Sequence, residues 1–260
     1  MDAAAWFPVT GLVMAVLGGV LGWFVPRLVA RIPEPDPEDP PAPADLPETG
    51  AASDVPEESA PTADRIEPKE TYAAIAALPG LAWKCALTAA VVAGLVGARL
   101  GWHPALLPLT YLVPVGVALG LVDWRTRLLP TKVIAPSYAV LVALTMLAAA
   151  VSGDWDSLVR AGWGWLIAGG VFFVLWFVYP RGMGYGDVRL SGLLGISLGY
   201  LGWGELVTGL YAAFILGGVG GLLLSALRIV DRKAYPFGPF MLVGALIGVL
   251  AGPGVAAWYA

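Results

Sequence analysis

The sequence is short of cysteine and of charge. Cys85 is the only cysteine among the 260 residues, and a lone cysteine can form neither an internal disulfide nor a CxxC metal site. Because no cysteine lies between residues 1 and 84, a zinc site built from thiolates is excluded in that part of the chain. We expect neither a bound metal nor a cofactor.

Charged residues make up 13% of the chain and form no basic patch, so nucleic acid is not an expected partner. The formal net charge of −4 misleads, because most of the acids lie in one segment between Glu34 and Glu70. In place of charge, the chain has 58% hydrophobic residues and a mean hydropathy of +0.76. This composition predicts an all-α, polytopic membrane protein that lies in a lipid bilayer.

Eight apolar runs are each long enough, at roughly 17 to 25 residues, to cross a bilayer as a helix. The first run lacks a positively charged start and a small-residue cleavage site, so we interpret it as a retained anchor rather than a signal peptide. The sixth run is short and rich in glycine, which leaves open a tilted span or a re-entrant segment. The runs cover approximately residues 8–29, 80–100, 105–122, 132–151, 160–180, 187–203, 206–227 and 237–258.

Changes in composition divide the chain into three parts. Residues 1–30 form the transmembrane anchor, residues 31–75 a linker rich in Pro and Glu, and residues 76–260 the membrane domain. The linker has few aromatic or β-branched residues, so it cannot bury enough apolar surface to offset the entropy lost on ordering. We expect a disordered cytoplasmic tether, which acts either as a plain solvated loop or as a docking segment.

Lysine and arginine residues gather after the first, third, fifth and seventh runs, and only Arg99 and Arg160 fall on the other side. Positively charged loops remain in the cytoplasm during membrane insertion. We therefore expect the N-terminus to be outside, and we expect Asp123 and Asp187 to lie at the cytoplasmic boundary.

These two aspartates are the candidate catalytic residues. Asp123 closes the third run, and Asp187 opens the sixth after glycines at positions 182, 184 and 186. An ionisable side chain at the edge of a spanning helix costs free energy, so its presence suggests work on a substrate or an ion. The fourth and fifth runs form a hairpin that leaves the boundary after the first acid and returns to it before the second.

Two adjacent carboxylates can share a proton, so that one removes a proton from water while the other protonates the substrate. Peptide hydrolysis by this route needs no metal. Each acid alone has a structural alternative. Asp187 could be a helix N-cap, and Asp123 could form an ion pair with Arg127, four residues on.

Three ordered motifs carry a resemblance to a known family. Gly184-Tyr185-Gly186-Asp187, Asp123 with Leu128-Leu129-Pro130, and Pro236-Phe237-Gly238-Pro239 resemble the type IV prepilin peptidases, bacterial members of the GxGD aspartic intramembrane proteases. Arg189 and Thr131 depart from the residues that are usual in the family. The resemblance implies that Asp123 and Asp187 form the catalytic dyad, with substrate-binding or supporting roles for Gly184, Tyr185, Gly186, Arg189, Pro130 and Lys132.

The resemblance also implies a substrate and a location. Enzymes of this family remove short, basic leader peptides from type IV prepilins and pseudopilins at the cytoplasmic face of the bacterial inner membrane, and pilus-assembly components are possible further partners. Many relatives carry a cysteine-rich domain after the first span and also N-methylate the new terminus with S-adenosylmethionine. Here the Pro/Glu-rich linker takes that place, so we do not expect N-methyltransferase activity.

Two other functions stay open. One is a different GxGD protease, such as a signal-peptide or presenilin-like enzyme, but Val122 stands where those enzymes have Tyr and no Pro-Ala-Leu follows Asp187. The other is a non-enzymatic carrier that uses the two acids as an ion relay. Broken helices with acids near the bilayer midplane would be typical of a carrier, and the sequence shows no such pattern.

Overall fold

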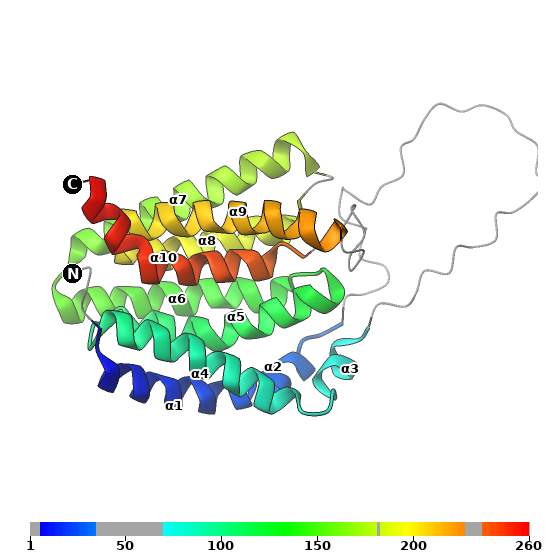
Figure 1. The fold of residues 1–260 in the computed structure, drawn as a ribbon. Coiled ribbons are helices and arrows are strands. Elements are labelled where there is room, and N and C mark those ends of the chain that lie inside the picture. The colour runs from blue at the N-terminus through cyan, green and yellow to red at the C-terminus, as the bar shows by residue number, and fades with distance from the viewer. Residues whose placement is uncertain (1–5, 35–69, 181–182, 227–235, 260) are drawn as a thin grey trace, which may run out of the picture.

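The computed structural model describes residues 6–34, 70–180, 183–226 and 236–259, and helices without strands make up this part of the chain. Long helices lie side by side along one axis, and two short helices, α2 and α3, lie at one end (Figure 1). The all-α prediction is confirmed for these residues. The elements are α1 (Pro8–Trp23), α2 (Val25–Ala30), α3 (Tyr72–Ala76), α4 (Leu81–Leu100), α5 (Leu106–Thr126), α6 (Thr131–Ser152), α7 (Trp155–Val178), α8 (Tyr185–Leu201), α9 (Trp203–Ala226) and α10 (Gly238–Tyr259).

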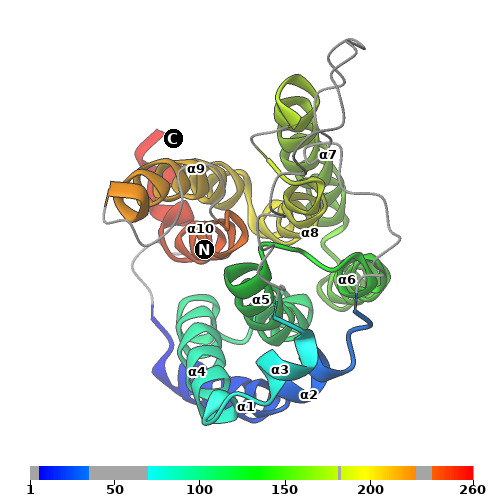
Figure 2. The same cartoon turned by 90° about the vertical axis from the view of Figure 1, so that its right-hand side faces the viewer.

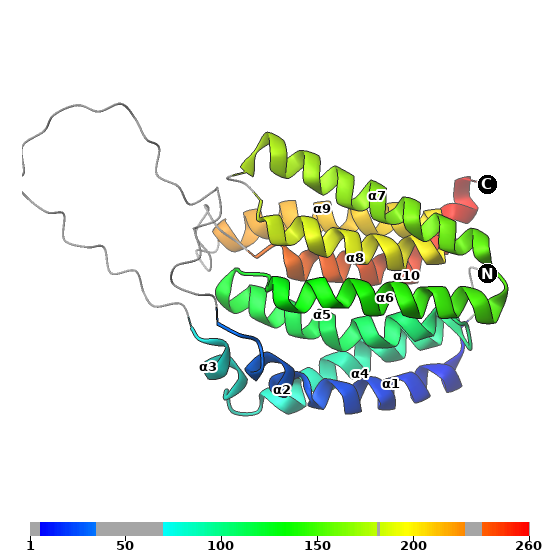
Figure 3. The same ribbon diagram turned by 180° about the vertical axis from the view of Figure 1, so that it is seen from behind.

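The described residues contain seven helical segments that are long and apolar enough to cross a membrane, with α1 and α2 together forming the first. Helix α8, the predicted sixth span, has only 17 residues. Every residue from Leu190 to Tyr200 is buried, because α8 lies between its neighbours, and it runs along the bundle beside α7 and α9 (Figures 1 and 3). The polytopic membrane fold is thus confirmed, and the arrangement of α8 favours a short internal span over a re-entrant segment.

Close helix pairs build the bundle, with α1 against α4, α7 against α8, and α9 against α10. Glycines permit these contacts. A Cβ atom on Gly164 would collide with the backbone of Gly195 across the α7–α8 contact, and one on Gly22 would lie 2.6 Å from the Cys85 carbonyl oxygen. Small residues of this kind let helices approach closely where lipid provides no hydrophobic driving force.

The linker prediction is wrong at its C-terminal end. Residues 72–76 form α3, capped by a 3.2 Å hydrogen bond from the Ala74 backbone N–H to the Thr71 hydroxyl. Tyr72 and Ile75 are buried, and the Tyr72 backbone N–H donates to the Glu34 carboxylate over 2.6 Å. Two apolar side chains at helical spacing therefore anchor this end of the segment. Residues 35–69 lie outside the described part of the chain.

The motifs identified in the sequence all lie at helix ends on one end of the bundle. Helix α5 ends, and α6, α8 and α10 begin, at the same end of the bundle, on the right in Figure 1. Helix α1 begins and α10 ends at the opposite end. Arg99 and Arg160, expected on the side away from the acids, belong to the last turn of α4 and the first turns of α7, at that opposite end. The two-sided arrangement inferred from the sequence is therefore present in the fold.

Candidate active site

Asp123 lies in the last turn of α5 and is buried, with 4% of its surface exposed. The helix ends at Arg127, whose φ of 56° is left-handed and whose backbone N–H donates to the Asp123 carbonyl oxygen over 2.8 Å. Although both residues are described, no salt bridge joins their side chains. The ion-pair alternative for Asp123 is therefore wrong, and Arg127 instead ends the helix that carries the acid.

Asp187 is the third residue of α8 and is also buried, with 8% of its surface exposed. Gly184 is the N-cap of α8, and its carbonyl oxygen accepts a 3.1 Å hydrogen bond from the Asp187 backbone N–H. The N-cap alternative for Asp187 is therefore wrong. An acid in the first turn is still favoured by the helix dipole, and its Oδ2 atom lies 3.4 Å from where a Cβ atom on Gly184 would stand.

The fold brings the two acids together from segments 64 positions apart. Both are buried at the same end of the bundle, Asp123 in the last turn of α5 and Asp187 in the first turn of α8. Gly186 contributes to this approach, because a Cβ atom there would lie 2.7 Å from the Leu129 Cβ atom. The glycine before the second acid thus packs directly on the loop that follows the first.

A third segment completes the site from α10. The backbone N–H of Gly238 donates a 2.9 Å hydrogen bond to the Asp123 Oδ2 atom. A Cβ atom on Gly238 would lie 2.7 Å from that same oxygen, so the close approach requires glycine. The motif around Gly238 is recognisable in the sequence, but we did not predict this residue as part of the site.

Arg189 links the first two motifs on the side of the site formed by α6 and α8. Its guanidinium donates to the Thr131 hydroxyl, and it lies over the Tyr185 ring at 4.6 Å from the centroid. Tyr185 also contacts Trp176, with 4.9 Å between ring centroids. The Tyr138 hydroxyl donates to the Arg189 carbonyl oxygen over 2.7 Å. The two positions that depart from the family pattern therefore contact each other.

The remaining predicted residues have distinct places. Pro130 is the N-cap of α6, and its carbonyl oxygen accepts from the backbone N–H of Val133 over 3.0 Å. Lys132 is exposed in the first turn of α6, and among the described residues no salt bridge connects it to either acid. Gly184 and Tyr185 are exposed beside Asp187. Pro130 thus begins α6 directly after the first motif, while Gly184 and Tyr185 lie exposed beside the buried Asp187.

Comparison with known proteins agrees with this arrangement. The family model described as the type IV leader peptidase family matches residues 110–224, which include both acids. This confirms the resemblance that we inferred from the motifs.

Curated relatives of this family are similar along much of the chain. The prepilin leader peptidase/N-methyltransferase of Pseudomonas putida is 33% identical over 177 residues, which cover 65% of this chain and 56% of the relative. The protein of the same name from Aeromonas hydrophila is 31% identical over 162 residues, covering 61% and 53%. That from Escherichia coli is 32% identical over 149 residues, covering 55% and 60%.

The matched chain spans little more than half the length of these relatives. No solved structure matches the chain significantly. The relationship to leader peptidases therefore comes from sequence, and the geometry of the site comes from the fold described above.

Proposed function

We propose that the protein is a membrane-embedded aspartic endopeptidase that removes the leader peptide from type IV prepilins or pseudopilins. The observation that carries the proposal is that two buried carboxylates, Asp123 and Asp187, come from distant segments to the same end of a membrane bundle. The match of residues 110–224 to the type IV leader peptidase family supports the substrate class. The names of the similar relatives support it further.

The proposed mechanism uses the two acids as a pair. One ionised carboxylate removes a proton from water, and the oxygen of that water attacks the carbonyl carbon of the scissile amide. The other, protonated carboxyl donates its proton to the carbonyl oxygen. As the C–N bond breaks, a proton passes to the leaving amine, so that a new carboxyl terminus and a new amino terminus form.

The backbone before Asp187 is suited to an extended substrate. Gly184 has φ −71° and ψ 144°, an extended conformation, and both it and Tyr185 are exposed. Without a Cβ atom, a glycine lets another backbone approach within hydrogen-bonding distance. We propose that the residues around the scissile bond lie along Gly184 and Tyr185.

The site is proposed to face the cytoplasm. The end of the bundle that carries Asp123 and Asp187 also carries Arg125, Arg127 and Lys132, and positively charged loops remain inside during insertion. A prepilin whose basic leader stays in the cytoplasm would present its scissile bond on this side. The proposed location is the bacterial inner membrane, with the N-terminus of the protein outside.

N-methylation is not part of the proposed activity, because no cysteine precedes Cys85 to build the thiolate zinc domain found in bifunctional enzymes. Adding radiolabelled S-adenosylmethionine to cleaved pilin and enzyme tests this point. Label in the new N-terminus would show that methylation is retained. Absence of label, beside a bifunctional relative that labels the same substrate, is the expected result.

Cleavage of a prepilin in membranes tests the proposed function. Membranes that contain the protein are mixed with a prepilin, and mass spectrometry locates the cut. The expected product begins immediately before the apolar helix of the pilin, after the leader. A cut inside the apolar segment would instead favour another GxGD protease. Proton or cation flux through proteoliposomes without cleavage would favour the ion relay.

A further inference from the structure

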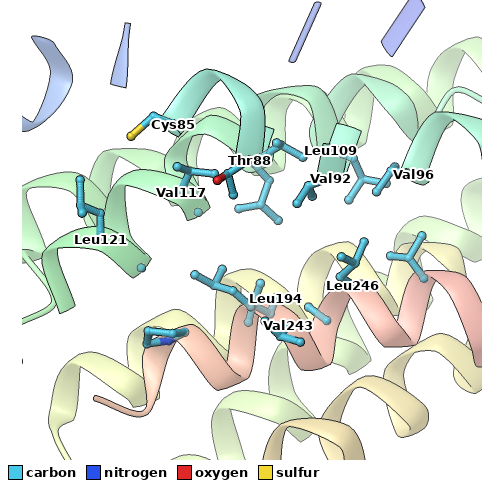
Figure 4. Close-up of a pocket in the computed structure, with 18 of the residues that line it drawn as sticks. Cys85, Thr88, Val92, Val96, Leu109, Val117, Leu121, Leu194, Val243 and Leu246 are labelled. Carbon is cyan, nitrogen blue, oxygen red and sulfur yellow. The ribbon is translucent and has the colours of Figure 1, made fainter. Parts of the chain in front are cut away.

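A long apolar cavity leads away from the candidate active site. It has a volume of about 610 Å³ and lies between α4 and α5 on one side and α8 and α10 on the other. Figure 4 shows Thr88, Val92 and Val117 on one wall, opposite Leu194 and Val243. Nothing in the proposed mechanism uses this space, so its role requires a separate explanation.

The cavity extends from the end of the bundle near Arg99 towards the end that carries the acids. Near the far end, the Arg99 guanidinium donates a 3.1 Å hydrogen bond from Nε to the Leu250 carbonyl oxygen and so ties α4 to α10. Val96 and Val249 form the lining beside this bond. At the near end the lining includes Trp124 and Pro239, the residues that follow Asp123 and Gly238. The cavity therefore ends beside the candidate catalytic site, although neither acid lines it.

The end view shows where a ligand could enter. In Figure 2, α10 lies above α4 on the left of the view, and α5 lies to the right between them. Side chains from α4 and α10 line the cavity from Leu81 to Val96 and from Pro239 to Val249. A cavity between two outer helices of a membrane bundle can be entered from the lipid.

The lining chemistry defines the ligand. The lining residues are mainly aliphatic, and Lys84, exposed near the start of α4, is the only charged side chain among them. Along α4 the lining extends over the 15 steps from Leu81 to Val96, or about 22 Å at 1.5 Å per residue. This is roughly three quarters of the 30 Å hydrocarbon thickness of a bilayer. The ligand should therefore be apolar, elongated and parallel to the bundle.

We propose that this groove, named here the α4–α10 groove, binds one face of the apolar helix that follows the scissile bond in the substrate. This inference rests on the proposed function. The end of the groove beside the candidate site supports this occupant. A helix lying between α4 and α10 would end beside Trp124 and Pro239, and the chain that leaves its N-terminus would then meet Asp123. Gly116 and Gly120 in the α5 wall let the Leu242 side chain of α10 pack closely, 3.1 Å from where a Cβ atom on either glycine would stand.

A matched pair of substitutions tests the α4–α10 groove. Val92→Trp places a large side chain in the groove, whereas Val91→Trp places the same side chain on the outer face of α4, where Val91 is 53% exposed. Each enzyme is given full-length prepilin and a short peptide that carries the scissile bond without the apolar helix. Val92→Trp is expected to lower the ratio of kcat/KM for prepilin over peptide about tenfold. The reason is that the apolar helix of the substrate, away from the scissile bond, would no longer contribute binding energy. Val91→Trp should leave this ratio at the wild-type value.

Disulfide crosslinking reports the ligand directly and independently of cleavage. The native cysteine is replaced by Cys85→Ala, a cysteine is placed at position 92 or at position 91, and single cysteines are placed along the pilin helix. Crosslinks from position 92 that recur with helical periodicity, and none from position 91, would support the proposal. The proposal would be overturned, in favour of bound lipid, by two results together. One is that the cysteine at position 92 crosslinks to no pilin residue, and the other is that Val92→Trp keeps the wild-type ratio of kcat/KM for prepilin over peptide. Failure of the wild-type enzyme to cleave prepilin would refute the proposed function, and the crosslinks would still report on the groove.

Discussion

Gly238 and Asp123 are joined by a 2.9 Å hydrogen bond from a backbone N–H to a carboxylate oxygen, although 115 positions separate them in the chain. This bond fixes the start of α10 on the end of α5. It also supplies a donor to one of the two candidate catalytic carboxylates, and hydrogen bonds that involve a charged partner are stronger than neutral ones. The loop before the last helix is thus part of the site.

Gly238→Ala is expected to reduce cleavage strongly while the protein stays folded. The new Cβ atom would lie 2.7 Å from the Asp123 Oδ2 atom, so either the carboxylate or α10 must move. We expect a loss of about 100-fold in kcat/KM, or about 2.7 kcal/mol of transition-state stabilisation. Gly254→Ala is the control, because Gly254 lies in the same helix with no atom within 4 Å of the added Cβ. Wild-type cleavage by Gly238→Ala would show that this contact is dispensable.

The contact between Arg189 and Thr131 is expected to hold the segments of the two acids in register. Arg189→Ala and Thr131→Ala should each lower kcat/KM about tenfold, equal to about 1.4 kcal/mol. If the contact is the shared cause, the double variant should be little worse than either single variant. Independent, additive losses in this double-mutant cycle would contradict a coupled role. Arg125→Ala serves as a control, since Arg125 pairs on the surface with Glu70.

Arg160 is expected to stabilise the end of the bundle away from the acids. Its guanidinium donates to the carbonyl oxygens of Gly199 and Tyr200 over 2.8 and 2.9 Å, and so satisfies the C-terminal end of α8. Arg160→Ala should lower the free energy of unfolding by about 2 kcal/mol, because hydrogen bonds from a charged donor are lost. Thermal unfolding in detergent would measure the change. A midpoint equal to that of the wild type would show that water or lipid replaces these bonds.

Cleavage is expected to have a bell-shaped dependence on pH. The mechanism needs one carboxyl ionised and the other protonated, so activity falls at low pH, where both are protonated, and at high pH, where both are ionised. Initial rates across a pH series in one detergent, with folding monitored at each pH, would test this. A rate that rises to a plateau at high pH would indicate a single ionised group instead of a shared proton.

Much of this fold was predictable because lipid imposes simple rules on sequence. The lengths of the apolar runs predicted the long helices. The positions of Lys and Arg in the connecting loops predicted that Asp123 and Asp187 lie at the same end of the bundle. The bond from Gly238 to Asp123 was not predictable, since spacing along the chain does not encode a contact between α5 and α10. Helix α3 was missed because the Pro- and Glu-rich composition of the whole linker concealed the helical spacing of Tyr72 and Ile75.

Charges outside the motifs illustrate the same limit. In the sequence, Arg99 and Arg160 served only as markers of the far side of the membrane. In the structure, Arg99 is buried and bonds to α10, and Arg160 bonds to the end of α8. A sequence shows that a charge lies at the end of a helix, but the carbonyl groups it reaches depend on how the helices pack.

The most direct test of the account is prepilin cleavage by the wild-type protein and by Asp123→Asn and Asp187→Asn. Asp156→Asn is the matched control, because Asp156 is an exposed acid in the first turn of α7 at the other end of the bundle. We predict that either dyad substitution abolishes cleavage while the folded protein still accumulates in the membrane, and that Asp156→Asn cleaves like the wild type. Cleavage that persists with Asp123→Asn or Asp187→Asn would contradict catalysis by the pair.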